Sequence, residues 1–119
     1  MTLLQSTCVA LSHLNLNDIA IYKTNTVTPH FDYVVIATAD SKRQLDAAVS
    51  NVEDEVYKNG YKVRGVEGKN GGTWILIDLN DILVNVFYKE EREKYGLDNM
   101  WRNLERVSFD QVISETKQS

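Results

Sequence analysis

Few side chains in this sequence have the types and spacing that catalysis requires. Neither His13 nor His30 stands at metal-ligand spacing with a second ligand. The one cysteine, Cys8, falls on the apolar stripe of a predicted helix, which favours a buried thiol over a nucleophile. The glycine-rich phosphate-binding motifs and the nucleophile-elbow motif are absent from the sequence. We therefore predict no catalytic residue, no metal site and no cofactor.

Two carboxylates, Glu67 and Asp78, end neighbouring predicted strands. Antiparallel pairing of these strands would place Glu67 near Thr73 rather than near Asp78. A two-carboxylate site for acid–base or metal chemistry is therefore poorly supported. Asp78 together with Asp81 is typical of an Asx-type turn.

Trp74 gives the strongest indication of function. On a strand, Trp74, Leu76 and Asp78 share one face, and the isoleucines between them share the other, which is the core face. A face that combines an aromatic, an aliphatic and an acidic side chain is typical of a protein-docking surface, because Trp and Tyr dominate interface hot spots. A helix that covers Trp74 explains the same pattern, and the pattern does not separate the two.

The elements that must position these residues alternate between helix and strand. Their predicted order is α-β-β-α-β-β-β-α in one domain over residues 1–106, followed by a loosely attached C-terminal tail over 107–119. The predicted helices cover 3–14, 41–58, 89–94 and 97–105, and the predicted strands cover 19–22, 33–39, 62–67, 73–78 and 82–87, with a hairpin loop at 68–72.

Two patterns indicate an α/β fold. The run at 33–39 is apolar and β-branched throughout, which indicates a strand covered on both faces. The next helix carries one apolar stripe, opens with a Ser41–Gln44 capping box and ends before Gly60. The stripe consists of Leu45, Ala48, Val49, Val52 and Val56. The helical crossover allows one parallel strand pair and the short loops force antiparallel pairs, so we predict a mixed five-strand sheet flanked by helices.

Composition and charge restrict the class of protein. The chain has 119 residues, 43% hydrophobic and 25% charged, which fits one globular domain. No apolar stretch is long enough for a membrane span, and no basic segment precedes the first apolar residues. A single cysteine and no signal peptide indicate the cytoplasm. The net charge of −4 disfavours a nucleic-acid binder and suits a basic protein partner.

An ordered set of segments resembles the ribosomal silencing factor family, also called the Iojap family. The resemblance covers about residues 10–103, and the segments are 32–37, 66–68, 74–78, 84–87 and Arg92 with Tyr95, Leu97 and Trp101. The sequence departs from the family pattern in three places. Asn85 replaces a usual His, Asp98 replaces a usual Glu, and Thr38-Ala39 replaces a frequent Ser-Gly.

The resemblance implies a binding protein rather than an enzyme. It implies a nucleotidyltransferase-like core and docking on the large ribosomal subunit through large-subunit protein fourteen, with little direct rRNA contact. This docking blocks joining with the small subunit and represses translation when nutrients are scarce. Since some members form homodimers when free, monomer and homodimer both stay open. The partner-binding residues expected here are Trp74, Leu76, Asp78, Glu67, Tyr95 and Trp101.

Two other functions remain as alternatives. A metal-dependent nucleotidyltransferase needs a Gly-Ser turn that leads into a helix, and carboxylates that converge on Mg²⁺. Here the turn is Thr38-Ala39-Asp40-Ser41, without glycine, and Glu67 and Asp78 are placed apart. A purely structural homodimer module is the third reading. Nucleotide binding and ribosome association would distinguish the three.

Overall fold

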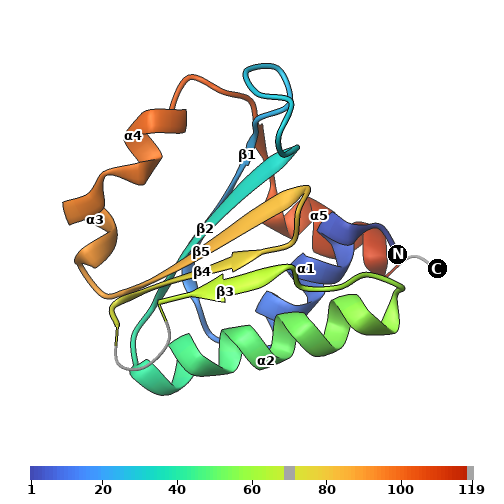
Figure 1. The fold of residues 1–119 in the computed structure, drawn as a ribbon, viewed down its shortest axis with the longest axis horizontal. Coiled ribbons are helices and arrows are strands. Elements are labelled where there is room, and N and C mark those ends of the chain that lie inside the picture. Colours follow the sequence, from blue (N-terminus) through green and yellow to red (C-terminus); the bar gives the residue numbers. More distant parts are fainter. Residues whose placement is uncertain (69–71, 118–119) are drawn as a thin grey trace.

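A six-stranded mixed sheet forms the centre of the molecule (Figure 1). The computed structural model describes residues 1–68 and 72–117. The elements are α1 (Leu3–Ser12), β1 (Asn17–Lys23), β2 (Tyr33–Ala39), α2 (Lys42–Lys58), β3 (Gly65–Glu67), β4 (Trp74–Asp78), β5 (Ile82–Tyr88), α3 (Glu91–Tyr95), α4 (Leu97–Trp101), β6 (Arg106–Val107) and α5 (Phe109–Thr116).

The strand order is β3-β4-β5-β2-β1-β6. Strands β2 and β5 run parallel, and every other neighbouring pair is antiparallel. The predicted α/β class and mixed sheet are confirmed. The predicted count of five strands is one too low, because Arg106 and Val107 pair with Tyr22 and Ile21 at the edge of the sheet. A two-residue strand has no alternation that a sequence could reveal.

One face of the sheet packs against α1, α2 and α5 (Figure 1). The predicted stripe of α2 is confirmed, since all five of its apolar residues are buried in this core. The Ser41 hydroxyl accepts the Gln44 N–H at 3.2 Å, as expected. The Gln44 side chain accepts the N–H of Asp40 rather than that of Ser41, so half of the predicted capping box forms. Gly60 follows the helix with a φ of +89°.

The C-terminal segment is part of this core. Helix α5 begins at the Ser108 cap, packs against α1, and buries Val112 to 5% exposure. The expectation of a loosely attached tail over 107–119 is therefore wrong for the described residues of that segment. Phe109, Val112 and Ile113 lie at helical spacing and pack in this core, but three apolar residues in a helix of eight do not by themselves show what the helix packs against.

The pairing of β3 with β4 also differs from expectation. Glu67 lies opposite Leu76, not near Thr73, and Gly65 lies opposite Asp78. The observed register places Val66 opposite Ile77, on the core face. The expected register would have moved Val66 to the other face, since a shift by an odd number of residues flips every side chain. Residues 69–71 of the predicted hairpin loop lie outside the described residues.

The other face of the sheet, here called the open face, carries the side chains that alternate with this core. Of the helices in the described part of the chain, only the short α3 and α4 stand on that side (Figure 1). The open face includes Trp74, Leu76, Asp78, Leu83, Asn85 and Phe87. No helix in residues 1–68 and 72–117 has the length and apolar character needed to cross a bilayer.

Candidate functional site

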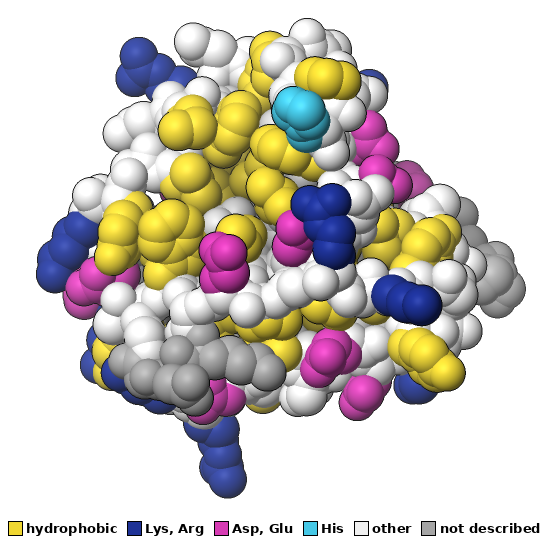
Figure 2. Space-filling model, in the orientation of Figure 1, with side chains coloured by type: hydrophobic (Ala, Val, Ile, Leu, Met, Phe, Trp, Pro, Cys, Tyr) yellow, Lys and Arg dark blue, Asp and Glu magenta, His cyan; other side chains and the backbone are white. Residues whose placement is uncertain are grey.

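An aromatic cluster lies on the open face, where β4, β5 and α3 meet. The ring of Trp74 stacks on Phe87 with centroids 5.1 Å apart, and Tyr95 approaches Trp74 with centroids 4.6 Å apart. Phe87 is fully buried, Trp74 is half-buried, and Tyr95 is 53% exposed. Figure 2 shows hydrophobic side chains gathered around a hollow on this side of the molecule, with acidic side chains at its border. Burial therefore decreases across the cluster, from Phe87 in the core through Trp74 to Tyr95 at the surface.

Trp74 is held in place by internal contacts. Its indole Nε1–H donates to Asn85 Oδ1 at 3.0 Å, and Asn85 is only 3% exposed. Asn85 Nδ2 in turn donates to the Val35 carbonyl at 3.5 Å. Gly68 has a φ of +88°, and a Cβ there would clash with the Trp74 carbonyl oxygen, so only glycine fits beside this strand. The orientation of the indole is therefore fixed before any partner arrives.

Three of the predicted docking residues continue the surface along β3 and β4. Leu76 follows Trp74 on the open face and is half-buried, and the exposed Glu67 lies across from it. Asp78 accepts two hydrogen bonds from the Arg64 guanidinium, at 2.8 and 3.0 Å, and a third from the backbone N–H of Asn80. Asp78 therefore already has a positive partner within the chain.

Trp101 lies in a different aromatic contact. Its ring meets Phe31 edge-on with centroids 6.2 Å apart. Like Trp74, it packs against the open-face core, a buried cluster that consists of Ala20, Tyr22, Val34, Ile36 and Phe87. The Trp101 Nε1 is buried and has no hydrogen-bond partner among the described residues. The structure thus brings Trp74, Leu76, Glu67 and Tyr95 together around β4. Asp78 lies at the end of that strand, and Trp101 packs on the same open-face core with its ring against Phe31.

Sequence reasoning did not assign Phe87, Leu83 or Met100 to this surface. On β5, Phe87 lies opposite Trp74 and Leu83 lies opposite Asp78. Once this pairing is known, the alternation of β5 places Phe87 and Leu83 on the open face. Met100 is 67% exposed on α4. No sequence signal marks Met100, because its helix contains only five residues.

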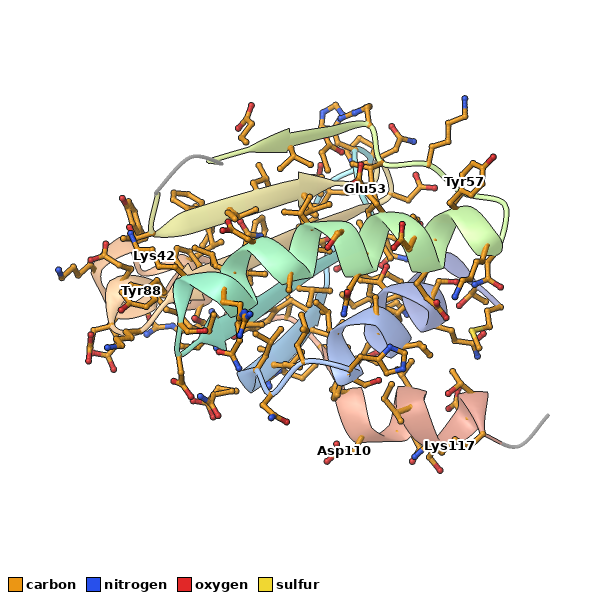
Figure 3. The ribbon with its side chains drawn as sticks, turned by 90° about the horizontal axis from the view of Figure 1, so that it is seen from below. Lys42, Glu53, Tyr57, Tyr88, Asp110 and Lys117 are labelled. Carbon is orange, nitrogen blue, oxygen red and sulfur yellow. The ribbon has the colours of Figure 1, made fainter. Side chains whose placement is uncertain are left out.

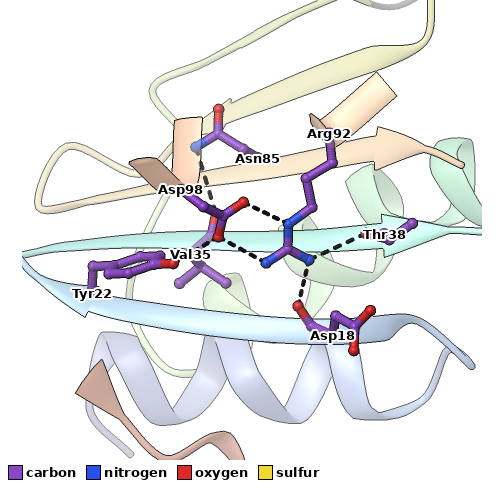
Figure 4. Close-up of polar contacts among 7 residues, drawn as sticks. All are labelled: Asp18, Tyr22, Val35, Thr38, Asn85, Arg92 and Asp98. Carbon is purple, nitrogen blue, oxygen red and sulfur yellow. Dashed lines mark hydrogen bonds and ion pairs between the residues drawn. The ribbon is translucent and has the colours of Figure 1, made fainter. Parts of the chain in front are cut away.

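A polar network fixes α3 and α4 to the sheet (Figure 4). Arg92 Nε and Nη2 donate to the two carboxylate oxygens of Asp98 at 2.8 and 3.0 Å. Tyr22 Oη donates to Asp98 at 2.7 Å. The donation from Arg92 lowers the pKa of the Asp98 carboxyl, against the opposing effect of burial. Burial and the hydrogen bond to Asp98 raise the pKa of the Tyr22 phenol.

The arrangement provides contact surface rather than reactive groups. In the described ranges, no three His, Cys, Asp or Glu side chains lie close enough together to hold a metal ion. Burial raises the pKa of the Cys8 thiol to about 12, which leaves it protonated and unreactive at neutral pH. Glu67 lies across from Leu76, and Asp78 lies two residues further along β4 on the same face, where it is paired with Arg64.

The outer side of α2 differs from the open face (Figure 3). Tyr57 is 75% exposed near the C-terminal end of α2, and the charged side chains of Glu53 and Lys58 lie around it. At the other end of the helix, the ammonium groups of Lys42 and Lys89 lie over the Tyr88 ring, at 5.6 and 5.1 Å from its centroid. Neither end carries a cluster of aromatic rings comparable to that around Trp74.

Comparisons with known proteins agree with this fold. The family described as ribosomal silencing factor during starvation matches residues 2–119. The ribosomal silencing factor of Haemophilus influenzae is 32% identical over 101 residues, which cover 85% of this chain and 99% of that protein. A mouse protein named for mitochondrial assembly of the ribosomal large subunit is 29% identical over 106 residues, 85% of this chain and 44% of its own.

A solved structure from Chromobacterium violaceum shares the fold. It superposes with a TM-score of 0.80 at 29% sequence identity, over 90% of this chain and 88% of that one. The resemblance inferred from the ordered segments is thereby confirmed, and the family name describes a regulatory factor rather than an enzyme. This chain belongs to the ribosomal silencing factor family.

Proposed function

We propose that this chain docks on the large ribosomal subunit through large-subunit protein fourteen, and that the open face around Trp74 makes the contact. The bound domain blocks joining with the small subunit and represses translation when nutrients are scarce. Membership of the family supports a role at the ribosome. The name of the mouse relative, which refers to assembly of the large subunit, supports the choice of subunit. The site of action would be the cytoplasm.

The main support for the proposal is the aromatic cluster, in which Phe87 is buried and Tyr95 is exposed. Trp74 lies between them with its ring already fixed by Asn85. Rigid aromatic side chains in an aliphatic surround are the usual composition of interface hot spots. A preorganised ring loses little conformational freedom on binding, which favours affinity.

Leu76 and Leu83 extend the apolar surface around this cluster, and Met100 adds an apolar side chain on α4, which stands on the same side of the sheet. The first two are half-buried in the free protein, and Met100 is mostly exposed. Docking would remove the remaining apolar area from water, at about 25 cal/mol per Å². A standard interface buries about 800 Å² on each partner. A domain with principal extents of 36 × 30 × 25 Å can offer such a patch and still project from the subunit surface.

Charge supports a protein partner over RNA. The chain carries a net charge of −4, and the exposed Glu67 and the partly exposed Asp78 lie beside Leu76. Acidic side chains at the rim attract a basic ribosomal protein and speed its encounter. The same charges repel rRNA phosphates, so direct rRNA contact stays small.

The test uses two variants that introduce the same charge on opposite sides of the molecule. Leu76→Lys places an ammonium on the open face, beside the basic partner, whereas Tyr57→Lys places it on α2. Binding to purified large subunits and to isolated large-subunit protein fourteen is measured by fluorescence titration. We expect Leu76→Lys to weaken both about 30-fold or more, which corresponds to about 2 kcal/mol at a hot spot. Tyr57→Lys should bind like the unmodified chain.

Two results would contradict the proposal. One is an unmodified chain that binds neither large subunits nor protein fourteen. The other is equal binding by Leu76→Lys and Tyr57→Lys, which would move the contact away from the open face. Circular dichroism spectra and thermal melts of both variants establish that they are folded.

A further inference from the structure

One guanidinium joins four segments of the chain at the rim of the open face (Figure 4). Arg92, on α3, forms a two-pronged pair with Asp98 on α4. Its Nη1 also donates to the Asp18 carbonyl of β1 at 2.5 Å and to Thr38 Oγ1 of β2 at 3.2 Å. The Arg92 side chain is 14% exposed, so the charge is largely withdrawn from water. A single side chain thus ties both short helices to two neighbouring strands.

Asp98 completes the connection from the other side. Besides the two bonds from Arg92, it accepts the hydroxyl of Tyr22, which is 4% exposed in the open-face core. The Arg106 guanidinium lies 5.1 Å from the centroid of the Tyr22 ring. The Asp98 carboxylate therefore receives donors from α3 and from β1. Tyr22 and Asp98 are 76 positions apart in the sequence, so the fold must form before this contact can.

Apolar packing does not hold these helices as it holds α2. Neither α3 nor α4, both fully described, has a buried residue, whereas α2 has five. Gly96 joins α3 to α4 in the left-handed conformation, with a φ of +62°. Leu97 and Trp101 are only partly buried against the open-face core. Without the polar network, the position of the segment over the sheet would rest on these partial contacts.

We infer that Arg92 is a positioning residue for docking, because its fork on Asp98 sets where α3 and α4 stand beside Trp74. The segment carries Tyr95, whose ring contacts Trp74, and the exposed Met100. This inference rests on the proposed function. Lysine at position 92 keeps the charge but lacks the planar fork that matches a carboxylate with two parallel bonds.

The experiment compares four variants with the unmodified chain. Arg92→Lys and Asp98→Asn each break the fork, which is the pair of hydrogen bonds from the Arg92 guanidinium to the Asp98 carboxylate. Asp98→Glu keeps a carboxylate, and Lys94→Gln removes one positive charge from the same helix without touching the network, because Lys94 pairs with Glu91. Affinity for isolated large subunits is measured by titration, and amide hydrogen exchange is followed over residues 91–101 and over α2.

We expect Arg92→Lys and Asp98→Asn to weaken binding about tenfold or more, in line with the loss of a charged bidentate pair. Exchange should accelerate over 91–101 and stay unchanged over α2, since the defect is local. Asp98→Glu should restore binding to within about threefold of the unmodified chain, because it retains the charged acceptor. Lys94→Gln should match the unmodified chain in both measurements.

The outcomes separate this inference from the proposed function. If the unmodified chain binds large subunits and the two fork variants bind like Lys94→Gln, the inference is overturned while the docking proposal stands. Unchanged exchange over 91–101 in both fork variants overturns it as well. Failure of the unmodified chain to bind large subunits refutes the docking proposal, and with it the inference that depends on it. Faster exchange over α2 as well would show a general loss of stability and refute a local positioning role.

Discussion

The hydrogen bond between Trp74 and Asn85 should stabilise the fold measurably, because it satisfies a buried amide on the open face. Asn85 is 3% exposed, and its Oδ1 accepts the indole N–H at 3.0 Å. Asn85→Leu preserves the volume of the side chain but leaves the indole N–H without its acceptor. Trp74→Phe preserves a ring on Phe87 but leaves the Asn85 oxygen without its donor.

General values for buried hydrogen bonds give the expected sizes of these effects. Leaving one buried partner unsatisfied costs about 1–3 kcal/mol, and a complete hydrogen bond contributes about 0.5–1.5 kcal/mol net. Each single variant should therefore lower the free energy of unfolding by about 1–3 kcal/mol. The double variant should lose about 1 kcal/mol less than the sum of the two, because it leaves neither partner alone.

Urea unfolding of the four proteins at pH 7, followed by circular dichroism, measures this coupling. A control cycle pairs Trp74→Phe with Val52→Ala, since Val52 is buried on α2 across the sheet and should behave additively. Additivity of the Trp74 and Asn85 substitutions to within about 0.3 kcal/mol would refute the reasoning. The same contacts explain why Leu76, rather than Trp74, is the cleaner probe of docking.

Three further predictions concern other parts of the molecule. A thiol reagent at pH 8 should label Cys8 slowly in the native protein and rapidly in urea, because burial raises its thiol pKa to about 12; rapid native labelling would contradict this. Asp98 has a lowered pKa in the folded state, so its stabilising contribution is complete above the unfolded value of 3.8 and is lost as the pH falls through the folded pKa. The gap in urea midpoint between the unmodified chain and Asp98→Asn should therefore shrink below about pH 4, and a constant gap would be inconsistent with this sign. Val112→Asp should cost about 3 kcal/mol or more, by placing an unpaired charge in the core, and an unchanged thermal melt would show that α5 is loosely attached after all.

The sequence predicted the elements whose burial repeats with a clear period. The stripe of α2 identified its buried face, and the apolar run at 33–39 identified a strand covered on both faces. The alternation in β4 correctly placed Ile75 and Ile77 in the core and Trp74 on the opposite face. These segments are long enough for local pattern to determine their structure.

The remainder depended on contacts between distant segments. The observed register of β3 places Val66 on the core face, opposite Ile77. The expected pairing of Glu67 with Thr73 did not take the burial of Val66 into account. Helix α5 carries Phe109, Val112 and Ile113 at helical spacing, but the surface of α1 that it covers is distant in the sequence, so the spacing alone did not show that the segment packs. The network of Arg92, Asp98 and Tyr22 spans 76 positions, so no spacing in the sequence could reveal it. The sequence therefore suggested individual residues of the candidate surface, but not how the fold brings these residues together.

The central claim is that docking of this chain prevents the two ribosomal subunits from joining. The most direct measurement mixes purified large and small subunits under joining conditions, with and without the protein, and separates the products on a sucrose gradient. The unmodified chain, added in excess over large subunits, should lower the joined-ribosome peak and migrate with the large subunit alone. Leu76→Lys should lower that peak far less, and Tyr57→Lys should act like the unmodified chain. An undiminished joined-ribosome peak, or migration of the protein with joined ribosomes, would contradict the account.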